Sequence, residues 1–171
     1  MQVSTESIKA LREQTSAGIM ECKRALQETD GDLDAATTIL RERGYEIAKK
    51  KEERATSQGL IECYIHTGGR IGAMVQVDCE SDFVARTPEF KELAHDIAMQ
   101  VVATCPVYIS KGEVPEGTEV DDEICLLQQQ FIKDPSKRVE DLIAEAVAKV
   151  RENIKIRRFV RFELGSDGHN E

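Results

Sequence analysis

The sequence predicts an α+β protein in which a three-helix bundle precedes a three-stranded antiparallel sheet packed with helices, in the order β-β-α-α-α-β. Three observations predict it: helical spacing of apolar residues before residue 45, two alternating segments joined by a Gly-Gly turn, and one alternating segment near the C-terminal end. We expect a bundle with a charged connector helix over 1–54, an α+β core and dimerisation domain over 55–164, and a flexible tail over 165–171.

The bundle is predicted from caps and turns between short amphipathic stretches. Ser4 or Thr5 can cap the first helix, because a side-chain oxygen there accepts from a free amide of the first turn. A turn at residues 15–18 separates the first helix from the second, and a turn at residues 30–32 separates the second from the third. The third helix should end near Gly44, and residues 45–56 should form a charged connector.

The sheet begins with a hairpin and is followed by a long helix. Residues 60–66 and 71–79 alternate between apolar and polar side chains, and Gly68 and Gly69 supply the positive φ angles of a tight turn. Thr87 and Pro88 are suited to the N-cap and first position of a helix. Its apolar face comprises Phe90, Leu93, Ala94, Ile97, Ala98, Val101 and Val102.

The C-terminal third is predicted as two helices and a strand. An acidic helix is expected near 121–133, and Asp134 and Pro135 should begin another. The final strand alternates, which places one set of apolar residues on a single face: Ile154, Ile156, Val160, Phe162 and Leu164. A three-stranded sheet leaves an edge exposed, so we expect a homodimer through that edge. The alternative is an edge screened by Arg157 and Arg161.

Composition narrows the function classes. The 171 residues carry a net charge of −9, which disfavours a general nucleic-acid binder. The five cysteines form no C-x-x-C pair and have no histidine at ligand spacing, so neither a metal site nor a cofactor is expected. The chain shows no signal peptide and no apolar run of the roughly 20 residues that span a membrane, which indicates a cytoplasmic protein.

The residue types of catalytic sites are present without their usual partners. His66, His95 and His169 have no serine, cysteine or carboxylate at a recognisable motif spacing, and no phosphate-binding glycine loop occurs. We therefore predict no catalytic residues and no enzyme, and favour a protein that works by binding.

The segment 77–86 is the strongest functional signal in the chain. Asp82 and Phe83 stand together at the end of a predicted strand, where a rigid element meets a connection. A core does not require this pair, since a buried phenylalanine rarely has an acid as its neighbour. The alternative is a helix-capping aspartate beside a core phenylalanine.

Several ordered stretches resemble the signatures of the elongation factor Ts family. Residues 11–26 (LREQTSAGIMECKRAL) and 30–44 resemble its N-terminal signature, a UBA-like three-helix bundle. Residues 64–72 and 77–86 (VDCESDFVAR) resemble its second signature. The chain departs at Ser81, where the family usually has threonine, and at Ile19, where it usually has methionine. It resembles the short form, which lacks the second core module of larger members and in which two subunits supply the whole function.

The resemblance implies a guanine-nucleotide exchange factor. It would bind elongation factor Tu·GDP and promote release of GDP and Mg²⁺, which leaves a nucleotide-free complex until GTP binds. The resemblance assigns Ser81, Asp82, Phe83 and Val84 to dislocation of the Mg²⁺ site. It assigns contact with the same GTPase through the bundle to Arg12, Ile19 and Met20.

Other interpretations remain open at this point. Ile19 and Met20 can instead belong to the bundle core. The bundle alone is also compatible with a UBA-like protein-binding module that has no exchange activity. The remaining alternatives are an enzyme that uses Asp82 or His66, and a purely structural dimer.

Overall fold

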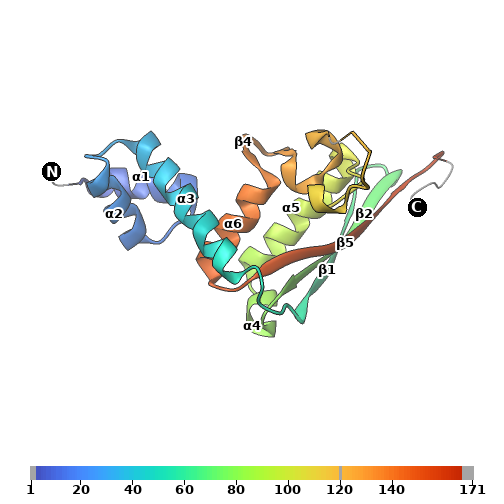
Figure 1. Cartoon of the computed structure of the whole chain (residues 1–171), viewed down its shortest axis with the longest axis horizontal. Coiled ribbons are helices and arrows are strands. Elements are labelled where there is room, and N and C mark those ends of the chain that lie inside the picture. Colours follow the sequence, from blue (N-terminus) through green and yellow to red (C-terminus); the bar gives the residue numbers. More distant parts are fainter. Residues whose placement is uncertain (1–2, 120, 167–171) are drawn as a thin grey trace.

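The computed structural model describes residues 3–119 and 121–166, and it confirms the α+β class (Figure 1). Helices form the N-terminal end, and a three-stranded sheet with helices on one side forms the rest. The elements in chain order are α1 (Thr5–Thr15), α2 (Ile19–Glu28), α3 (Leu33–Lys51), β1 (Gln58–Ile65), β2 (Ile71–Cys79), α4 (Asp82–Ala85), α5 (Pro88–Thr104), β3 (Gln130–Phe131), β4 (Asp134–Arg138), α6 (Val139–Val150) and β5 (Ile154–Glu163), with short 3₁₀ turns between α5 and β3.

The first three helices form a small bundle with its own core. Ser4 Oγ accepts a hydrogen bond from the Ser7 amide, so the cap predicted for the first helix forms at Ser4. Asp32 Oδ1 accepts from the amides of residues 34 and 35 and caps α3. Between the helices lie the buried side chains of Leu11, Cys22, Ala25, Leu26, Ala36 and Leu40. A core of this size stabilises a bundle only marginally, which makes its contacts with the rest of the chain important.

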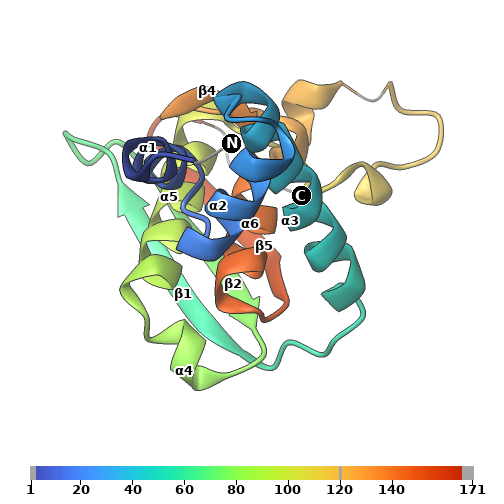
Figure 2. The same ribbon diagram turned by 90° about the vertical axis from the view of Figure 1, so that its left-hand side faces the viewer.

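The third helix is longer than predicted, because it passes through Gly44 and ends at Lys51. Gly44 of α3 lies against α6, where a Cβ atom would be in ordinary van der Waals contact with the Ala144 carbonyl oxygen, at 3.7 Å. The Tyr45 hydroxyl donates to Asp141 Oδ1 at 2.7 Å. The predicted connector is therefore the second half of α3, and Figure 2 shows it running beside α6.

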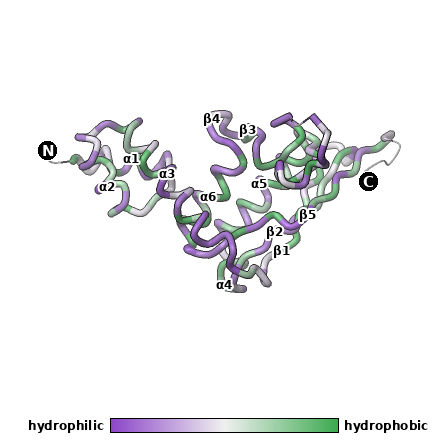
Figure 3. The backbone as a smooth tube through the Cα atoms, in the orientation of Figure 1, coloured by the Kyte–Doolittle hydropathy of each residue, from purple (hydrophilic) through white to green (hydrophobic). Residues whose placement is uncertain are grey.

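The sheet has the order β1-β2-β5 with both pairings antiparallel, and the hairpin turns at Gly68 and Gly69 with positive φ angles as predicted. The strands carry both hydrophobic and hydrophilic residues in Figure 3. The inward face of β2 carries Ala73, Val75, Val77 and Cys79 and packs against α5, which Thr87 caps as predicted by accepting from the Phe90 amide. The main core therefore lies between the sheet and its helices.

The final strand contains a β-bulge that overturns the prediction of one continuous apolar face. Ile156 pairs with Val77 and Arg158 pairs with Gln76, so Arg157 is the extra residue. After the bulge the alternation reverses. Phe159 packs against the core, whereas Phe162 is exposed and pairs with Gly72 on the uncovered face.

The prediction of an acidic helix near 121–133 is wrong. The segment instead contains 3₁₀ turns at Asp122–Ile124 and Leu126–Gln128, followed by the short β3–β4 pair. The reason is the fully buried Gln100 of α5, whose amide donates to the Gln130 carbonyl and accepts from the Ile132 amide. These bonds hold the segment extended. Asp134 and Pro135 consequently lie in β4, and α6 begins later than predicted, at Val139.

Gly59 provides a direct test of the hairpin packing. Its φ is +151°, and a Cβ atom there would lie 2.2 Å from the Val77 carbonyl oxygen of the paired strand. We expect Gly59→Ala to lower the free energy of unfolding by at least about 3 kcal/mol, because the backbone of β2 would have to move. Urea unfolding followed by circular dichroism measures this loss. Gly112→Ala, whose nearest neighbouring atom is at 3.6 Å, is the control and should change little.

Candidate protein-binding site

The turn after β2 places Phe83 outside the protein. Ser81 is the N-cap of α4, with an extended backbone (φ −125°, ψ 155°), and its Oγ accepts from the Val84 amide at 3.4 Å. Phe83 is 81% exposed, the most exposed of the large hydrophobic side chains among the described residues. The alternative of a capping aspartate beside a core phenylalanine is therefore wrong, because the serine is the cap and the ring is outside.

The neighbours of Phe83 divide between anchoring and exposed positions. Val84 packs against the main core and Ala85 is buried, so one side of α4 is fixed to the body. Asp82 is about half exposed and pairs with Arg86 at 2.9 Å. The turn thus presents a carboxylate and an aromatic ring side by side, and the partner of that carboxylate lies on the surface.

The turn is held from behind by three hydrogen bonds to two carboxylates. We call this group the carboxylate clasp, made of Glu80, Ser81, Glu152 and Asn153. Glu152 accepts from the Ser81 amide at 2.9 Å and from the Ser81 hydroxyl at 2.5 Å. In return, Glu80 accepts from the Asn153 amide at 2.6 Å. Bonds to ionised carboxylates are about twice as strong as neutral ones, so the clasp makes the start of α4 rigid.

The clasp is the part of the site that sequence analysis missed. Glu152 and Asn153 lie 71 and 73 residues after their partners, and no local pattern relates the two segments. The available signal was the pairing of the strands on either side, because β2 and β5 pair as far as Cys79 and Ile154. A correct register would have placed residue 81 near residue 152.

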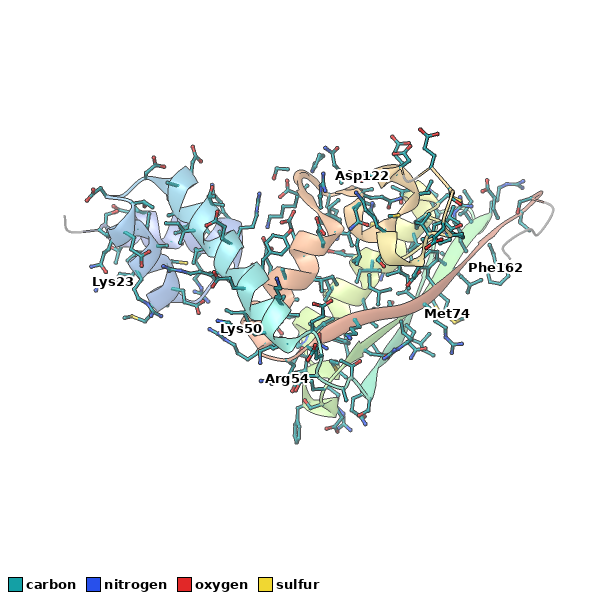
Figure 4. All side chains as sticks on the ribbon, viewed as in Figure 1. Lys23, Lys50, Arg54, Met74, Asp122 and Phe162 are labelled. Carbon is teal, nitrogen blue, oxygen red and sulfur yellow. The ribbon has the colours of Figure 1, made fainter. Side chains whose placement is uncertain are left out.

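The bundle residues assigned by the resemblance form a second exposed surface. Arg12 is exposed, and Ile19 and Met20 at the start of α2 are 55% and 62% exposed. The core interpretation of Ile19 and Met20 is wrong, since Cys22, Ala25 and Leu26 fill the interior. The structure does not bring this surface together with Phe83. In Figure 4, Lys23 of α2 lies at the bundle end of the molecule, whereas Arg54, which is close to α4, lies near its middle.

The histidines and hollows of the described chain do not form a second centre of chemistry. His66 Nδ1 lies 3.1 Å from the Tyr64 hydroxyl, and His95 Nδ1 lies 3.3 Å from Glu62. Within residues 3–119 and 121–166, no group of three or more His, Cys, Asp or Glu is placed to hold a metal ion. The hollow between the bundle and α6 is lined mainly by charged side chains and includes none of residues 81–84.

Cys79 lies directly beneath the turn. Its thiol donates to the Ser81 carbonyl, and burial together with the nearby Glu152 carboxylate raises the pKa of this thiol to about 11. Cys22 and Cys125 are buried as well, and Cys63 and Cys105 are exposed. None of the five forms a disulfide within the chain.

The fold defines a protein with two separate exposed apolar surfaces, one on a helical bundle and one at the end of a sheet. The comparisons with known proteins give the family. The family model described as Elongation factor TS matches residues 2–121 and 116–166. Elongation factor Ts of Herpetosiphon aurantiacus is 45% identical over 98% of this chain and 100% of its own length.

Two further relatives agree. Elongation factor Ts of Heliobacterium modesticaldum is 48% identical over 95% of this chain and 90% of its own length, and that of Thermotoga neapolitana is 44% identical over 98% and 100%. The chain therefore belongs to the elongation factor Ts family, a family of translation elongation factors. None of the helices in the described part of the chain has the length and apolar character needed to span a membrane.

The comparisons also show a difference in length. The alignment with the Herpetosiphon protein runs over 198 positions, although this chain has 171 residues, so the relative has residues that this chain lacks. The two matches to the family model overlap at 116–121, in the loop before the first acidic 3₁₀ turn.

Thiol labelling tests the environment of Cys79. At pH 8 a thiol with a pKa of about 11 is almost entirely protonated, and only the thiolate reacts, so Cys79 should label slowly in the folded protein. We expect fast reaction of Cys63 and Cys105 with a disulfide reagent, and reaction of Cys22, Cys79 and Cys125 only after denaturation. Mass spectrometry of the labelled peptides identifies the sites. Fast labelling of Cys79 in the folded state would contradict the buried position.

Proposed function

We propose that the chain is a guanine-nucleotide exchange factor for elongation factor Tu. It binds the GDP form of that GTPase, promotes release of GDP and Mg²⁺, and holds the empty form until GTP binds. Membership of the family supports this proposal. The observation that carries it is Phe83, an aromatic ring 81% exposed beside a carboxylate on a rigidly held turn.

The work of exchange is thermodynamic linkage and needs no covalent step. A protein that binds the empty GTPase more tightly than the GDP-bound one weakens GDP binding by the same factor. Each tenfold loss of GDP affinity requires about 1.4 kcal/mol of differential binding. Burial of the Phe83 ring in the partner supplies up to about 3 kcal/mol if it occurs only in the exchange complex. We therefore propose no catalytic residues and no cofactor.

The site residues divide this work. Phe83 is the wedge, and Asp82, once it leaves Arg86, accepts hydrogen bonds from groups that the wedge displaces near the Mg²⁺ site. Mg²⁺ demands near-ideal octahedral geometry, so a small shift of its ligands releases it. Ser81 and Val84 hold the wedge in place. Arg12, Ile19 and Met20 bind the same GTPase through the bundle, which is compatible with action in the cytoplasm, where translation takes place.

Release of a fluorescent GDP analogue from elongation factor Tu tests both the function and the wedge. Wild-type protein should accelerate release, and Phe83→Ala should reduce the acceleration about 10- to 100-fold, because the variant loses most of the apolar area that the partner buries. Val107→Ala removes another exposed apolar side chain outside both surfaces and should match the wild type.

Each possible result separates the candidate functions. Acceleration that survives Phe83→Ala would retain the exchange function and exclude the wedge. No acceleration by folded wild-type protein would exclude the exchange function. If the wild-type protein nevertheless binds elongation factor Tu and Met20→Ala abolishes that binding, the result would favour the UBA-like binding module.

We also propose that the chain is a homodimer through its sheet. The helices cover one face of the sheet, and the other face carries exposed apolar side chains, namely Ile61, Ile65, Met74 and Phe162. Met74 and Phe162 lie on the side opposite α5 and α6 in Figure 4. Monomeric proteins rarely leave such a continuous patch open, and a second copy offers a matching surface. We propose this open face rather than the predicted edge, because the exposed apolar side chains of the strands lie on the face.

Sedimentation velocity tests the dimer. Phe162→Glu places a charge on a side chain that is 68% exposed in the single chain, so it should leave the fold intact and dissociate the dimer. Val107→Glu adds the same charge at an exposed position beside β5 but outside the open face, and should remain dimeric. A wild-type protein that sediments as a monomer at all concentrations would exclude the proposal.

A further inference from the structure

The turn that carries Phe83 is too short to hold its own direction. α4 has four residues, and an isolated single turn of helix is unstable because nucleation fixes several residues for one hydrogen bond. Its capping bond from the Val84 amide to Ser81 Oγ is long, at 3.4 Å. The direction of α4 therefore depends on what holds Ser81 from outside the helix.

The carboxylate clasp is placed to provide that hold. The β2–β5 ladder ends with the pair Cys79 and Ile154, and beyond this pair the two strands diverge. From there, side-chain carboxylates replace the ladder: Glu152 binds the amide and hydroxyl of Ser81, and Glu80 binds the Asn153 amide. Both oxygens of Glu152 are used on one residue, which fixes Ser81 in position and in orientation.

The turn between α6 and β5, which contains Glu152 and Asn153, also holds the segment between α3 and β1. Asn153 is 3% exposed, and its side-chain amide donates to the carbonyls of Glu52 and Arg54 at 3.1 and 2.8 Å. Arg151, whose φ of +62° reverses the chain after α6, pairs with Glu21 of α2 at 2.6 Å. Arg151, Glu152 and Asn153 thus contact the bundle, the α4 turn and the segment between α3 and β1, respectively.

We propose that Glu152 is a positioning residue for nucleotide exchange. It touches neither partner nor nucleotide, and it acts by holding Ser81 so that Phe83 stays outside in the orientation that the GTPase requires. This inference rests on the proposed exchange function and extends it to a residue outside both family signatures. Loss of the carboxylate leaves the fold and the bundle surface in place but lets the α4 turn move.

The kinetic test uses the full chain with elongation factor Tu and a fluorescent GDP analogue. Glu152→Ala should lower the maximal rate of GDP release about tenfold or more, since small misplacements of a positioned group are costly, with little change in the concentration for half-maximal effect. Glu152→Gln keeps the size and one acceptor and should be intermediate. Glu140→Ala, which removes a glutamate at the opposite end of α6, should equal the wild type.

A double-mutant cycle with Ser81 locates the effect. Ser81→Ala removes the hydroxyl but retains the amide that Glu152 binds, so it should cost less than Glu152→Ala. If Glu152 acts through Ser81, the double variant should lose less than the sum of the two single losses, with a small extra loss because Ser81 Oγ also caps the Val84 amide. Additive losses would overturn the proposed route.

Hydrogen exchange of the free protein supplies a readout that is independent of the GTPase. In Glu152→Ala, the peptide 79–86 should exchange faster while the peptide 19–28 of α2 is unchanged. Unchanged exchange in both peptides would overturn the clasp, and faster exchange with wild-type nucleotide release would overturn the positioning role. If the wild-type protein does not accelerate GDP release from elongation factor Tu, the proposed function is excluded. The hydrogen-exchange result on the clasp would still stand.

Discussion

The packing of α5 against one face of a three-stranded sheet is the interaction on which the rest of the molecule depends. Phe90, Ile97 and Val101 are almost fully buried against Val75 and Val77, and each such side chain contributes about 1.5–3 kcal/mol of burial free energy. Because this single layer of helices satisfies the fold, the opposite face of the sheet remains available. The strand ends are also fixed, and the α4 turn therefore projects from a rigid base.

The bundle gains its position from the same framework. The core of the bundle is small. The second half of α3 packs against α6, where Gly44 lies beside Ala144 and the Tyr45 hydroxyl donates to Asp141. Burial and the neighbouring Asp141 carboxylate raise the pKa of Tyr45, so the hydroxyl remains a donor. Asp141 also accepts from the Arg138 amide at the start of α6. One carboxylate thus connects the cap of a body helix to the helix of the bundle.

The sequence predicted those features whose causes are local. The cap at Thr87, the glycine turn of the hairpin and the exposed pair Asp82–Phe83 each follow from residues within a few positions of one another. The failures have distant causes. Gln100 holds residues 129–132 extended from about 30 positions away, in a segment whose own composition favours a helix. The bulge at Arg157 depends on the register with β2, and Glu152 meets Ser81 only after the sheet has formed.

The unbroken course of α3 has a mechanical consequence. Its 19 residues form a rod about 28 Å long, since each residue of an α-helix rises about 1.5 Å. The contact of Gly44 with α6 lies between the two ends of this helix and can serve as a pivot. With the pivot at Gly44, a tilt of about five degrees moves the Leu33 end of the helix by about 1.4 Å. Leverage applied at the bundle can therefore reach the sheet without unfolding any intervening segment.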